Sequence, residues 1–314
     1  KQFFGQDGDT SNTRNRLVNS YSNYRHYDID IRNRQEILKV IQRFVPDVII
    51  HTAAQPSHDY AASIPFEDFE INALGTLNLV EALRRHNEMG IFIHMSTNKV
   101  YGDRPNSIPL VEKETRWDFS DRRYFNGIPE DFGIDQTKHS LFGASKLAAD
   151  VLVQEYGRYF GMNSCILRGG CLTGSMHSGV ELHGFLNYLV KCNVKRTKYS
   201  IFGYKGKQVR DNIHSSDVVR FIDEFISKPR VAEIYNMGGG RQNSCSILES
   251  FKLVEEVTGK PMIFEYTPNN RKGDHICYIS NLEKMKSHYP RWKVRLNLKQ
   301  LVQEIVERYD AEEQ

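Results

Sequence analysis

The chain of 314 residues is 39% hydrophobic and 26% charged, and its formal net charge is only +3. Disordered chains contain fewer apolar residues, and nucleic-acid-binding proteins carry a stronger positive charge, so the composition argues against both classes. No run of about 18 apolar residues, the length of a membrane helix, occurs in the chain. Residues 1–10 also lack the apolar stretch of a signal peptide. We therefore expect a globular protein of one large domain or two lobes, cytoplasmic, that binds neither nucleic acid nor a membrane.

The cysteines are odd in number, widely spaced and without a Cys-x-x-Cys pair. Zinc sites ordinarily use such pairs, so no metal site is expected. Isolated thiols of this kind usually pack as small apolar side chains. We predict free thiols at Cys165, Cys171, Cys192, Cys245 and Cys277.

From Tyr24 onward, short β-like runs alternate with amphipathic stretches, which is the pattern of βαβ units on a parallel sheet. Hydrophobic periodicity and capping residues set the predicted boundaries. The elements predicted in the first half are a strand at 26–31, a helix at 34–44, a buried strand at 47–51, a long helix at 66–86, a strand at 91–95, a long helix at 141–160 with Ser140 as its N-cap, and a strand at 164–167.

After Arg168 the elements become shorter, and we interpret this half as a smaller, discontinuous substrate lobe. Residues 1–167 are then the dinucleotide-binding domain, incomplete at its start, and residues 168–314 are mainly the substrate lobe, with parts that return to the first domain. The loop at 104–137 is long and polar, as functional loops often are. The elements predicted here are helices at 182–191, 216–226, 247–258 and 298–309 and strands at 199–202 and 234–237.

The two long helices at 66–86 and 141–160 carry apolar residues on more than one face. A helix that is apolar on two sides is usually covered on two sides. These helices are therefore predicted to pack on the sheet and also on a second subunit, in a homodimer or homotetramer.

A dinucleotide-binding fold opens with a strand, a glycine-rich turn and a helix, about 30 residues in all. The first 22 residues contain Gly5 and Gly8, but no strand precedes these glycines and no apolar helix follows them. They are therefore poor candidates for a phosphate loop. We expect the glycine-rich βα unit to be absent from this chain.

Two polar segments directly follow predicted strands. The first is His51–Gln55, with the sequence HTAAQ, and the second is Ser96–Gly102, with the sequence STNKVYG; Asn72 lies in the helix between them. In this order they resemble the extended short-chain dehydrogenase/reductase family, which includes sugar epimerases and dehydratases. The resemblance runs from Tyr27 to about Tyr309. It implies an α/β fold with a Rossmann-type, doubly wound parallel sheet and NAD as the cofactor.

In that family, small residues after the first of these strands let the cofactor approach. An acidic and an aliphatic residue at the end of the preceding strand hold the adenine ring, and Asp30 and Ile31 stand at that place here. An acidic residue at a strand end otherwise often caps a helix. The cofactor-binding residues that the resemblance implies are Asp30, Ile31, Thr52, Ala53, Ala54, Gln55, Asn72 and Lys146.

The family's catalytic Tyr and Lys stand four residues apart on one face of a helix. In the matching segment Lys146 is present, but Phe142 occupies the tyrosine position. The family's tyrosinate takes the hydroxyl proton as hydride leaves the carbon, and the lysine lowers its pKa and holds the nicotinamide ribose. Because phenylalanine cannot do this, another group serves as base, the chemistry is impaired, or the residue was substituted. The implied catalytic positions are Thr97, Phe142 and Lys146, and the candidate substitute bases are Tyr101, Tyr124, Cys171 and Lys146.

Downstream segments resemble the family's site for a nucleotide-diphosphate sugar. Arg210 lies in an Arg-Asp-x-x-His motif, Asn236 in a Tyr-Asn-x-Gly turn, and Arg271 matches a second diphosphate-binding arginine. Guanidinium groups suit a diphosphate because they bind its oxygens bidentately. In the family the residue at Thr97 binds the reacting sugar hydroxyl. The substrate-binding residues implied are Thr97, Asn98, Arg210, Asn236 and Arg271.

The residues after Thr97 separate the reactions of this family. Sugar 4,6-dehydratases carry an Asp-Glu pair there, whereas this chain has Asn98 and Lys99, so dehydration is not expected. The string Ser96–Asp103 looks most like the CDP-tyvelose (CDP-paratose) 2-epimerases. The resemblance implies NAD-dependent epimerisation at C2 of a CDP-dideoxyhexose through a 2-keto intermediate, with the cofactor kept bound. The alternatives are a catalytically impaired sugar-nucleotide-binding homologue, and another nucleotide-sugar epimerase or reductase of the same family.

Overall fold

The computed structural model describes residues 11–177, 179–181, 184–271 and 273–312. Gly5, Gly8 and Leu182, the predicted start of a helix, lie outside these ranges. The α-helices are α1 (Ser11–Ser20), α2 (Arg34–Phe44), α3 (Pro65–Phe69), α4 (Gly75–His86), α5 (Ser140–Phe160), α6 (Phe185–Val194), α7 (Ser215–Ser227), α8 (Ile247–Thr258), α9 (Glu283–His288) and α10 (Leu298–Glu312). The strands are β1 (Val48–His51), β2 (Ile91–Thr97), β3 (Leu110–Glu112), β4 (Trp117–Phe119), β5 (Ser164–Gly169), β6 (Cys171–Thr173), β7 (Tyr199–Phe202), β8 (Val209–His214), β9 (Glu233–Met237), β10 (Ser244–Ser246) and β11 (Phe264–Thr267).

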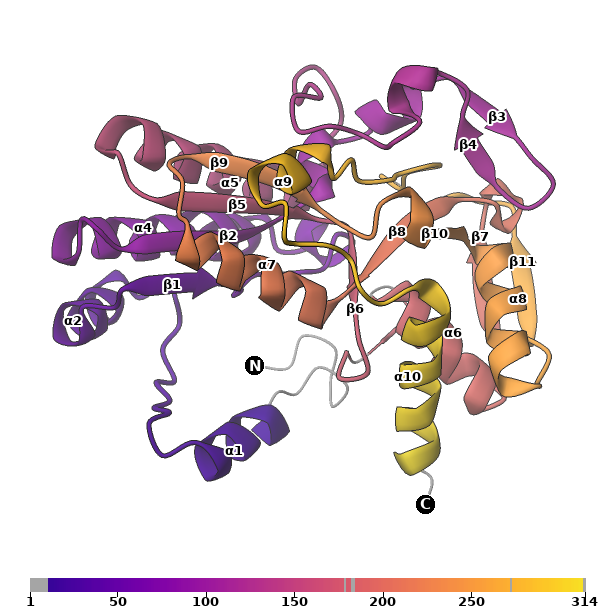
Figure 1. Cartoon of the computed structure of the whole chain (residues 1–314), viewed down its shortest axis with the longest axis horizontal. Coiled ribbons are helices and arrows are strands. Elements are labelled where there is room, and N and C mark those ends of the chain that lie inside the picture. The colour runs from indigo at the N-terminus through magenta and orange to yellow at the C-terminus, as the bar shows by residue number, and fades with distance from the viewer. Residues whose placement is uncertain (1–10, 178, 182–183, 272, 313–314) are drawn as a thin grey trace.

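A parallel sheet forms one side of the molecule in Figure 1, in the strand order β1-β2-β5-β9. Every neighbouring pair in this sheet is parallel, so the predicted parallel sheet is confirmed. β5 is buried along its whole length and β2 along most of it, as expected of parallel strands that helices cover on both faces.

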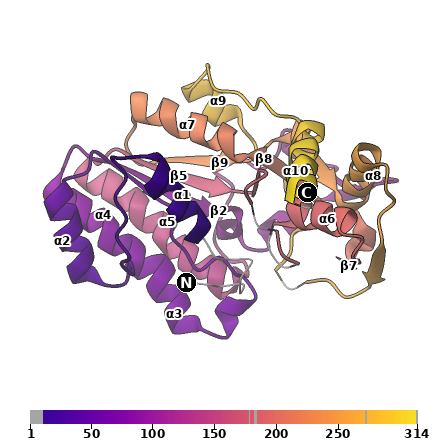
Figure 2. The same cartoon turned by 90° about the horizontal axis from the view of Figure 1, so that it is seen from below.

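Helices cover both faces of this sheet, as Figure 2 shows. Phe92 and Ile166 pack in one cluster with side chains of α4 and α5. Ile93 and Leu167, the next residues along their strands, pack with Phe221 of α7 in a second cluster. The alternation follows from the two-residue period of a strand, which places successive side chains on opposite faces.

The predicted strand at 26–31 is wrong, because these residues form turns and irregular backbone. A strand requires a hydrogen-bonded neighbour, and in the described residues nothing pairs with the outer side of β1. β1 is for the same reason an edge strand rather than the buried strand predicted, and Ile50 is 45% exposed. The segment instead packs Ile29 and Ile31 against the cluster between α2 and α4.

The predicted helices agree closely with the structure where end signals are strong. α2 spans the predicted residues, and the side chain of Asn33 accepts a hydrogen bond from Glu36 N at its start. The long predicted helix at 66–86 consists of α3, one π-helical turn at Glu70–Leu74, and α4. α5 begins at Ser140, whose Oγ accepts a hydrogen bond from Gly143 N as the predicted cap would.

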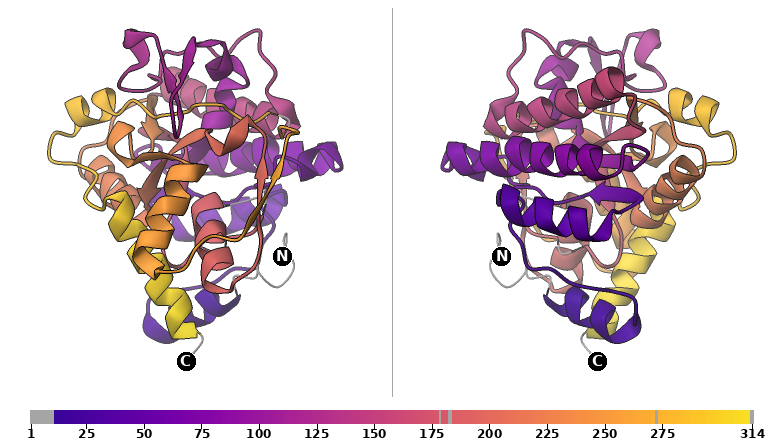
Figure 3. Two further views of the ribbon diagram at one scale, coloured as in Figure 1. Left: turned by 90° about the vertical axis from the view of Figure 1, so that its right-hand side faces the viewer. Right: turned by 90° about the vertical axis from the view of Figure 1, so that its left-hand side faces the viewer.

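The smaller lobe lies beside the carboxyl ends of the central strands and is seen face-on in Figure 3, left. It contains a three-stranded sheet in the order β10-β8-β6 and the parallel pair β11-β7. Its apolar core lies between α6, α8, α10 and β7. β6, β8, β10, β11 and α9 were not predicted. β9 and α7, although they follow this lobe's first elements in sequence, belong to the central sheet and its cover.

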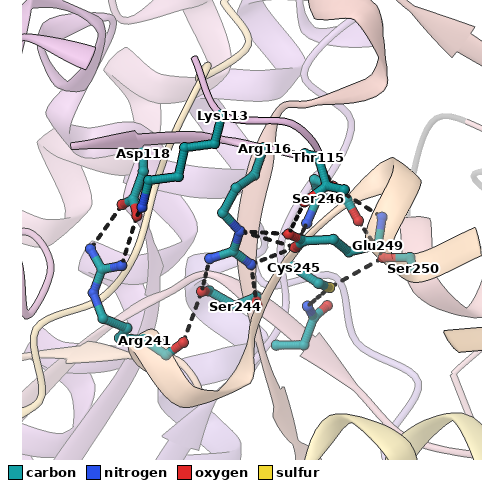
Figure 4. A network of polar contacts seen from close by, with 11 residues as sticks. Lys113, Thr115, Arg116, Asp118, Arg241, Ser244, Cys245, Ser246, Glu249 and Ser250 are labelled. Carbon is teal, nitrogen blue, oxygen red and sulfur yellow. Dashed lines mark hydrogen bonds and ion pairs between the residues drawn. The ribbon is translucent and has the colours of Figure 1, made fainter. Parts of the chain in front are cut away.

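The long loop at 104–137 includes the antiparallel hairpin of β3 and β4, which side chains tie to the smaller lobe (Figure 4). Arg116 Nε lies 2.9 and 3.0 Å from the two carboxylate oxygens of Glu249 at the start of α8. Arg241 Nη2 lies 3.0 Å from Asp118 Oδ1. One arginine reaches from the hairpin to α8, and the other reaches from the segment before β10 to the hairpin. Both therefore hold the hairpin on the smaller lobe.

The predicted free thiols are confirmed, and four of the five cysteines are buried; Cys171 is half-buried. Among the described residues, no helix combines the length and the apolar character that a membrane crossing requires.

Candidate active site

A cavity of about 690 Å³ lies where the carboxyl ends of the central strands meet the smaller lobe. Open α/β sheets bind ligands at this edge. Thr97 at the end of β2, Phe142 on α5 and Cys171 on β6 line one part of the cavity. Arg210 on β8 and Arg271 line it from the smaller lobe. The cavity therefore brings together predicted catalytic and substrate-binding positions that are up to 174 residues apart (97 to 271).

Thr97 is the last residue of β2, and its Oγ1 accepts a hydrogen bond from Lys99 N at 3.2 Å. This bond starts the 3₁₀ turn at Asn98–Tyr101. Asn98 is buried and lines the cavity beside Thr97. The turn therefore places three successive residues, Thr97, Asn98 and Lys99, in the wall of the cavity.

Phe142 and Lys146 lie one turn apart on α5, as predicted. Phe142 is 8% exposed and lines the cavity, so the tyrosine position of the family lies at the predicted site. Lys146 lies deeper and does not line the cavity; its Nζ donates to Met95 O of β2 at 2.7 Å. Burial lowers the pKa of Lys146 to about 8, although Asp150 and Asp68 oppose the shift.

Charged side chains from both sides of the cavity form a cationic cluster around one acid. Arg210 Nη2 is hydrogen-bonded to Asp274 Oδ1, and Lys99 Nζ lies 4.0 Å from the same oxygen. Burial alone would raise the pKa of Asp274, but the charges of Arg210 and Lys99 outweigh it and hold that pKa below its usual value. Arg271 lies in the cavity wall with its Nη2 2.9 Å from Asp59 Oδ2. Three cations face one cavity, and an anionic ligand satisfies such a cluster.

The loop after β1 is held in place by the π-helical turn. Asn72 Oδ1 accepts from Gln55 N at 2.9 Å, and Asn72 Nδ2 donates to Ser145 Oγ on α5 at 3.0 Å. The side chain of Gln55 is fully buried and donates to Asp68 Oδ1. Both side chains therefore position the loop, whereas Thr52 and Ala53 are exposed. The cavity reaches this loop at Pro56 and His58 but does not include residues 52–55.

Asp30 and Ile31 lie outside the cavity. Asp30 accepts two hydrogen bonds from the guanidinium of Arg32, at 3.0 and 2.7 Å, and its side chain is 41% exposed. Ile31 rests on the first residue of α4, where a Cβ on Gly75 would lie 2.5 Å from Ile31 Cδ1. Asn78 Nδ2 donates to Ile31 O at 2.9 Å, which fixes this segment on α4.

Asn236 also lies outside the cavity. It is fully buried; its Nδ2 donates to Ile128 O and its Oδ1 accepts from the hydroxyl of Tyr101, both at 2.8 Å. The Asn236 amide therefore links β9 to the segments that carry Tyr101 and Ile128.

The candidate substitute bases differ in their surroundings. Burial raises the pKa of Tyr101 to about 12, with Arg168 opposing, and the cavity does not include this residue. Burial also raises the pKa of Cys171 to about 12. Tyr124 packs in the apolar cluster under the long loop.

Lys99 was not predicted as a base from the sequence, although it belongs to the motif Ser96–Gly102. Its Nζ donates to Gly273 O at 2.8 Å, and it lines the cavity beside Phe142. His58 and Asp274 were also not predicted. Contacts across 174 residues of sequence leave no local signal, so only the motif around Thr97 could have indicated Lys99.

Comparisons with known proteins agree with this geometry. Residues 5–238 match the model of the NAD dependent epimerase/dehydratase family. The CDP-paratose 2-epimerase of Salmonella typhi is 33% identical over 297 residues, which cover 92% of this chain and 85% of that protein. The UDP-glucose 4-epimerase of Thermotoga maritima, solved with UDP-glucose, has a TM-score of 0.77 at 23% identity and covers 95% and 88% of the two chains.

The UDP-glucuronic acid 4-epimerase of Bacillus cereus, solved with UDP-glucuronic acid and NAD, also has a TM-score of 0.77, at 22% identity, with 96% of this chain and 86% of that chain covered. The likeness to these structures confirms the expected Rossmann-type fold. The family match confirms the expected cofactor, NAD. The chain belongs to the NAD dependent epimerase/dehydratase family.

Proposed function

We propose that the protein epimerises a CDP-activated dideoxyhexose at C2, with NAD as a tightly held cofactor and a 2-keto intermediate. The observation that carries this proposal is the single cavity lined by Thr97, Arg210 and Arg271. It offers a hydroxyl for the sugar and two guanidinium groups for the diphosphate. The choice of C2 and of CDP rests on the similarity to the Salmonella typhi enzyme.

The residues present fit the two ends of NAD. Asp30 provides an exposed carboxylate for the adenine amine, and the small side chains at Thr52 and Ala53 leave the loop after β1 open to a close approach. Lys146, whose Nζ is bound to Met95 O of β2, would hold the nicotinamide ribose as the lysine of the family does. Residues 11–33, which precede α2, contain no glycine, so no pyrophosphate cradle is assigned there. When bound, NAD accepts hydride from the sugar carbon and returns it.

The chain's own groups position the sugar and exclude water. Arg210 and Arg271 bind the diphosphate, and their charge is preserved at all relevant pH values. Thr97 holds the reacting hydroxyl, with its own orientation set by the bond from Lys99 N. Asn72 and Gln55 keep the loop after β1 in place and act without touching the sugar. No Asp-Glu pair follows Thr97 to expel a C6 hydroxyl, so water is not lost from the sugar.

Incubation of the protein with NAD and CDP-paratose tests this proposal, with the product resolved by anion-exchange chromatography and NMR. We expect an equilibrium mixture of CDP-paratose and CDP-tyvelose, with no net NADH. UDP-glucose and dTDP-glucose serve as control substrates and should remain unchanged. Epimerisation of UDP-glucose instead would overturn the assigned position and nucleotide.

A second candidate function is sugar-nucleotide binding without catalysis, and Phe142 is the observation that favours it. Thr97 argues against this reading, because binding alone gives no reason to keep a hydroxyl at the reacting position. Binding of CDP-paratose in calorimetry, with no epimer from the native protein or from the variant Phe142→Tyr, would support it.

A further inference from the structure

The family's proton acceptor is missing at Phe142, yet the cavity wall at this place contains another titratable group. Phe142 and Lys99 both line the cavity. Their backbones are adjacent, since a Cβ on Gly143 would lie only 3.0 Å from Lys99 O. α5 therefore packs at its Phe142–Gly143 step directly on the turn that carries Lys99.

The same turn joins Lys99 to the residue assigned to the sugar hydroxyl. Lys99 N donates to Thr97 Oγ1 at 3.2 Å, and both side chains line the cavity. Lys99 thus shares one wall with Thr97 and Phe142, the two positions that flank the reacting hydroxyl in the proposed function.

Most of the other titratable groups that line the cavity, within the described residues, are less suited to accept this proton. Arg210 and Arg271 carry guanidinium groups, which do not act as bases in proteins, and the neighbouring cations hold the pKa of Asp274 below its usual value. Burial raises the pKa of Cys171 to about 12 and that of Tyr199 still further. The remaining groups approach from other segments, namely His58 from the loop after β1 and His177 and Glu181 from the segment after β6.

We infer that Lys99 is the catalytic base that replaces the tyrosine of the family, an inference that rests on the proposed C2 epimerisation. The neutral amine of Lys99 takes the proton of the C2 hydroxyl, so that the O–H bond breaks and an N–H bond forms on Nζ. The electron pair of the C2–H bond leaves as hydride to the oxidised nicotinamide, and C2 becomes a ketone. In the return step hydride reaches the other face of C2, and the Lys99 ammonium gives the proton back to the oxygen.

The surroundings of Lys99 favour its neutral form. Burial lowers the pKa of Lys99 to about 8; Asp274 opposes this shift, Arg210 and Arg271 reinforce it, and Cys171 opposes it weakly. His58 and His275 also face this group and titrate below it, because burial lowers both of their pKa values. A base must be deprotonated to work, so turnover is expected to rise with pH through about 8 and then to level off.

The test compares Lys99→Met and Lys99→Arg, each alone and combined with Phe142→Tyr. We expect each single variant to lose turnover by roughly 10²–10⁴-fold, the range typical of a positioned acid/base group. Lys99→Arg retains the positive charge but not the base, so its affinity for CDP-paratose should stay near that of the native protein. Turnover of the double variant with Lys99→Met and Phe142→Tyr should be at least tenfold higher than that of Lys99→Met alone. Its dependence on pH should also differ from that of the native protein. Lys198→Met, on an exposed lysine paired with Glu265, is the matched control and should leave turnover unchanged.

A second measurement needs no turnover. Reductive methylation with ¹³C-formaldehyde followed by NMR titration should show two lysine signals with a pKa near 8, those of Lys99 and Lys146. The Lys99 signal should be absent from Lys99→Arg, and the Lys146 signal should remain. A Lys99 signal that titrates near the ordinary lysine value of about 10.4 would overturn the inference. Full activity of Lys99→Arg and Lys99→Met would also overturn it while leaving C2 epimerisation in place. An inactive native protein would instead contradict the proposed function.

Discussion

The arginines of the cavity illustrate how single residues define this site. Arg271 is bound to Asp59 across 212 residues of sequence, at 2.9 Å, and Arg210 is bound to Asp274. Each guanidinium is therefore already oriented by a carboxylate before an anion arrives, which reduces the side-chain entropy lost on binding.

Replacement of Arg271 by Ala is predicted to weaken the binding of CDP, because a charged hydrogen bond contributes about 1.5–3 kcal/mol, or roughly 10–150-fold in Kd. Calorimetric titration of CDP into the variant measures this loss. Arg291→Ala, on an exposed arginine paired with Glu224, is the matched control and should bind CDP normally. Equal affinities in both variants would remove Arg271 from the diphosphate site.

Residue roles could be predicted from the sequence only where a motif resembles one of the family. Thr97, Phe142 and Arg271 were predicted from such motifs and do line the cavity. Asn236 was predicted to bind the substrate, but its amide is bound to Tyr101 and Ile128 outside the cavity. A motif gives the order of residues and not the direction of a side chain. It therefore cannot distinguish a side chain that faces a ligand from one that is bonded only to its protein neighbours.

At the scale of elements, the predicted ends were accurate where a cap is encoded locally. α8 spans the predicted residues because Ser246 and Glu249 form a capping box at its start and Gly259 adopts a positive φ of 67° just beyond its end. The strand predicted at 26–31 failed because strand formation depends on a neighbour that the local sequence does not specify. β6, β8, β10 and β11 were missed for the same reason, because each pairs with a strand that lies far away in the sequence.

Arg116 is one of the side chains that tie the hairpin of β3 and β4 to the smaller lobe, so its removal should destabilise the contact with α8. Arg116→Met leaves the half-buried Glu249 without its partner, and we expect a loss of about 1–3 kcal/mol in the free energy of unfolding. Urea unfolding followed by circular dichroism measures this difference. Arg123→Met, which removes an exposed ion pair with Asp121, is the control and should unfold like the native protein. An unchanged midpoint for Arg116→Met would show that the hairpin is held by other contacts.

At the scale of the whole molecule, α5 lies beside α3 and α4 on one outer face, as Figure 3, right, shows. Phe66 is 81% exposed and Phe69 53%, and on α5 Leu141 is 49% exposed. Large apolar side chains that are exposed on neighbouring helices are typical of a subunit interface. The helices predicted at 66–86 and 141–160 carry apolar residues on more than one face. Together with these exposed side chains, this supports a proposed homodimer that forms through α3, α4 and α5.

Phe66→Glu is predicted to convert this dimer to a monomer, because a charge in a symmetric apolar contact meets its own copy across the axis. Light scattering coupled to size-exclusion chromatography at micromolar concentration gives the mass. Val219→Glu on α7, where Val219 is 62% exposed, is the control and should remain a dimer. A native protein that elutes as a monomer at this concentration would contradict the proposal.

The division into a sheet and a smaller lobe gives the site its two functions. The sheet side carries Thr97, Phe142 and Lys146, and the smaller lobe carries Arg210 and Arg271. In the proposed function, the catalytic groups lie on the strands and helices of the sheet side, and the nucleotide-binding groups lie across the cavity, where they can select the substrate independently of the chemistry.

The most direct test of the central claim is the fate of deuterium at C2 of CDP-paratose when the native protein and NAD convert it. In the proposed reaction hydride leaves C2 and returns to the same carbon from a cofactor that stays bound. Mass spectrometry and NMR should therefore show that the epimer still carries deuterium at C2. Epimer that has lost deuterium to solvent would contradict hydride transfer at C2. A complete absence of epimer would contradict the proposed epimerase itself.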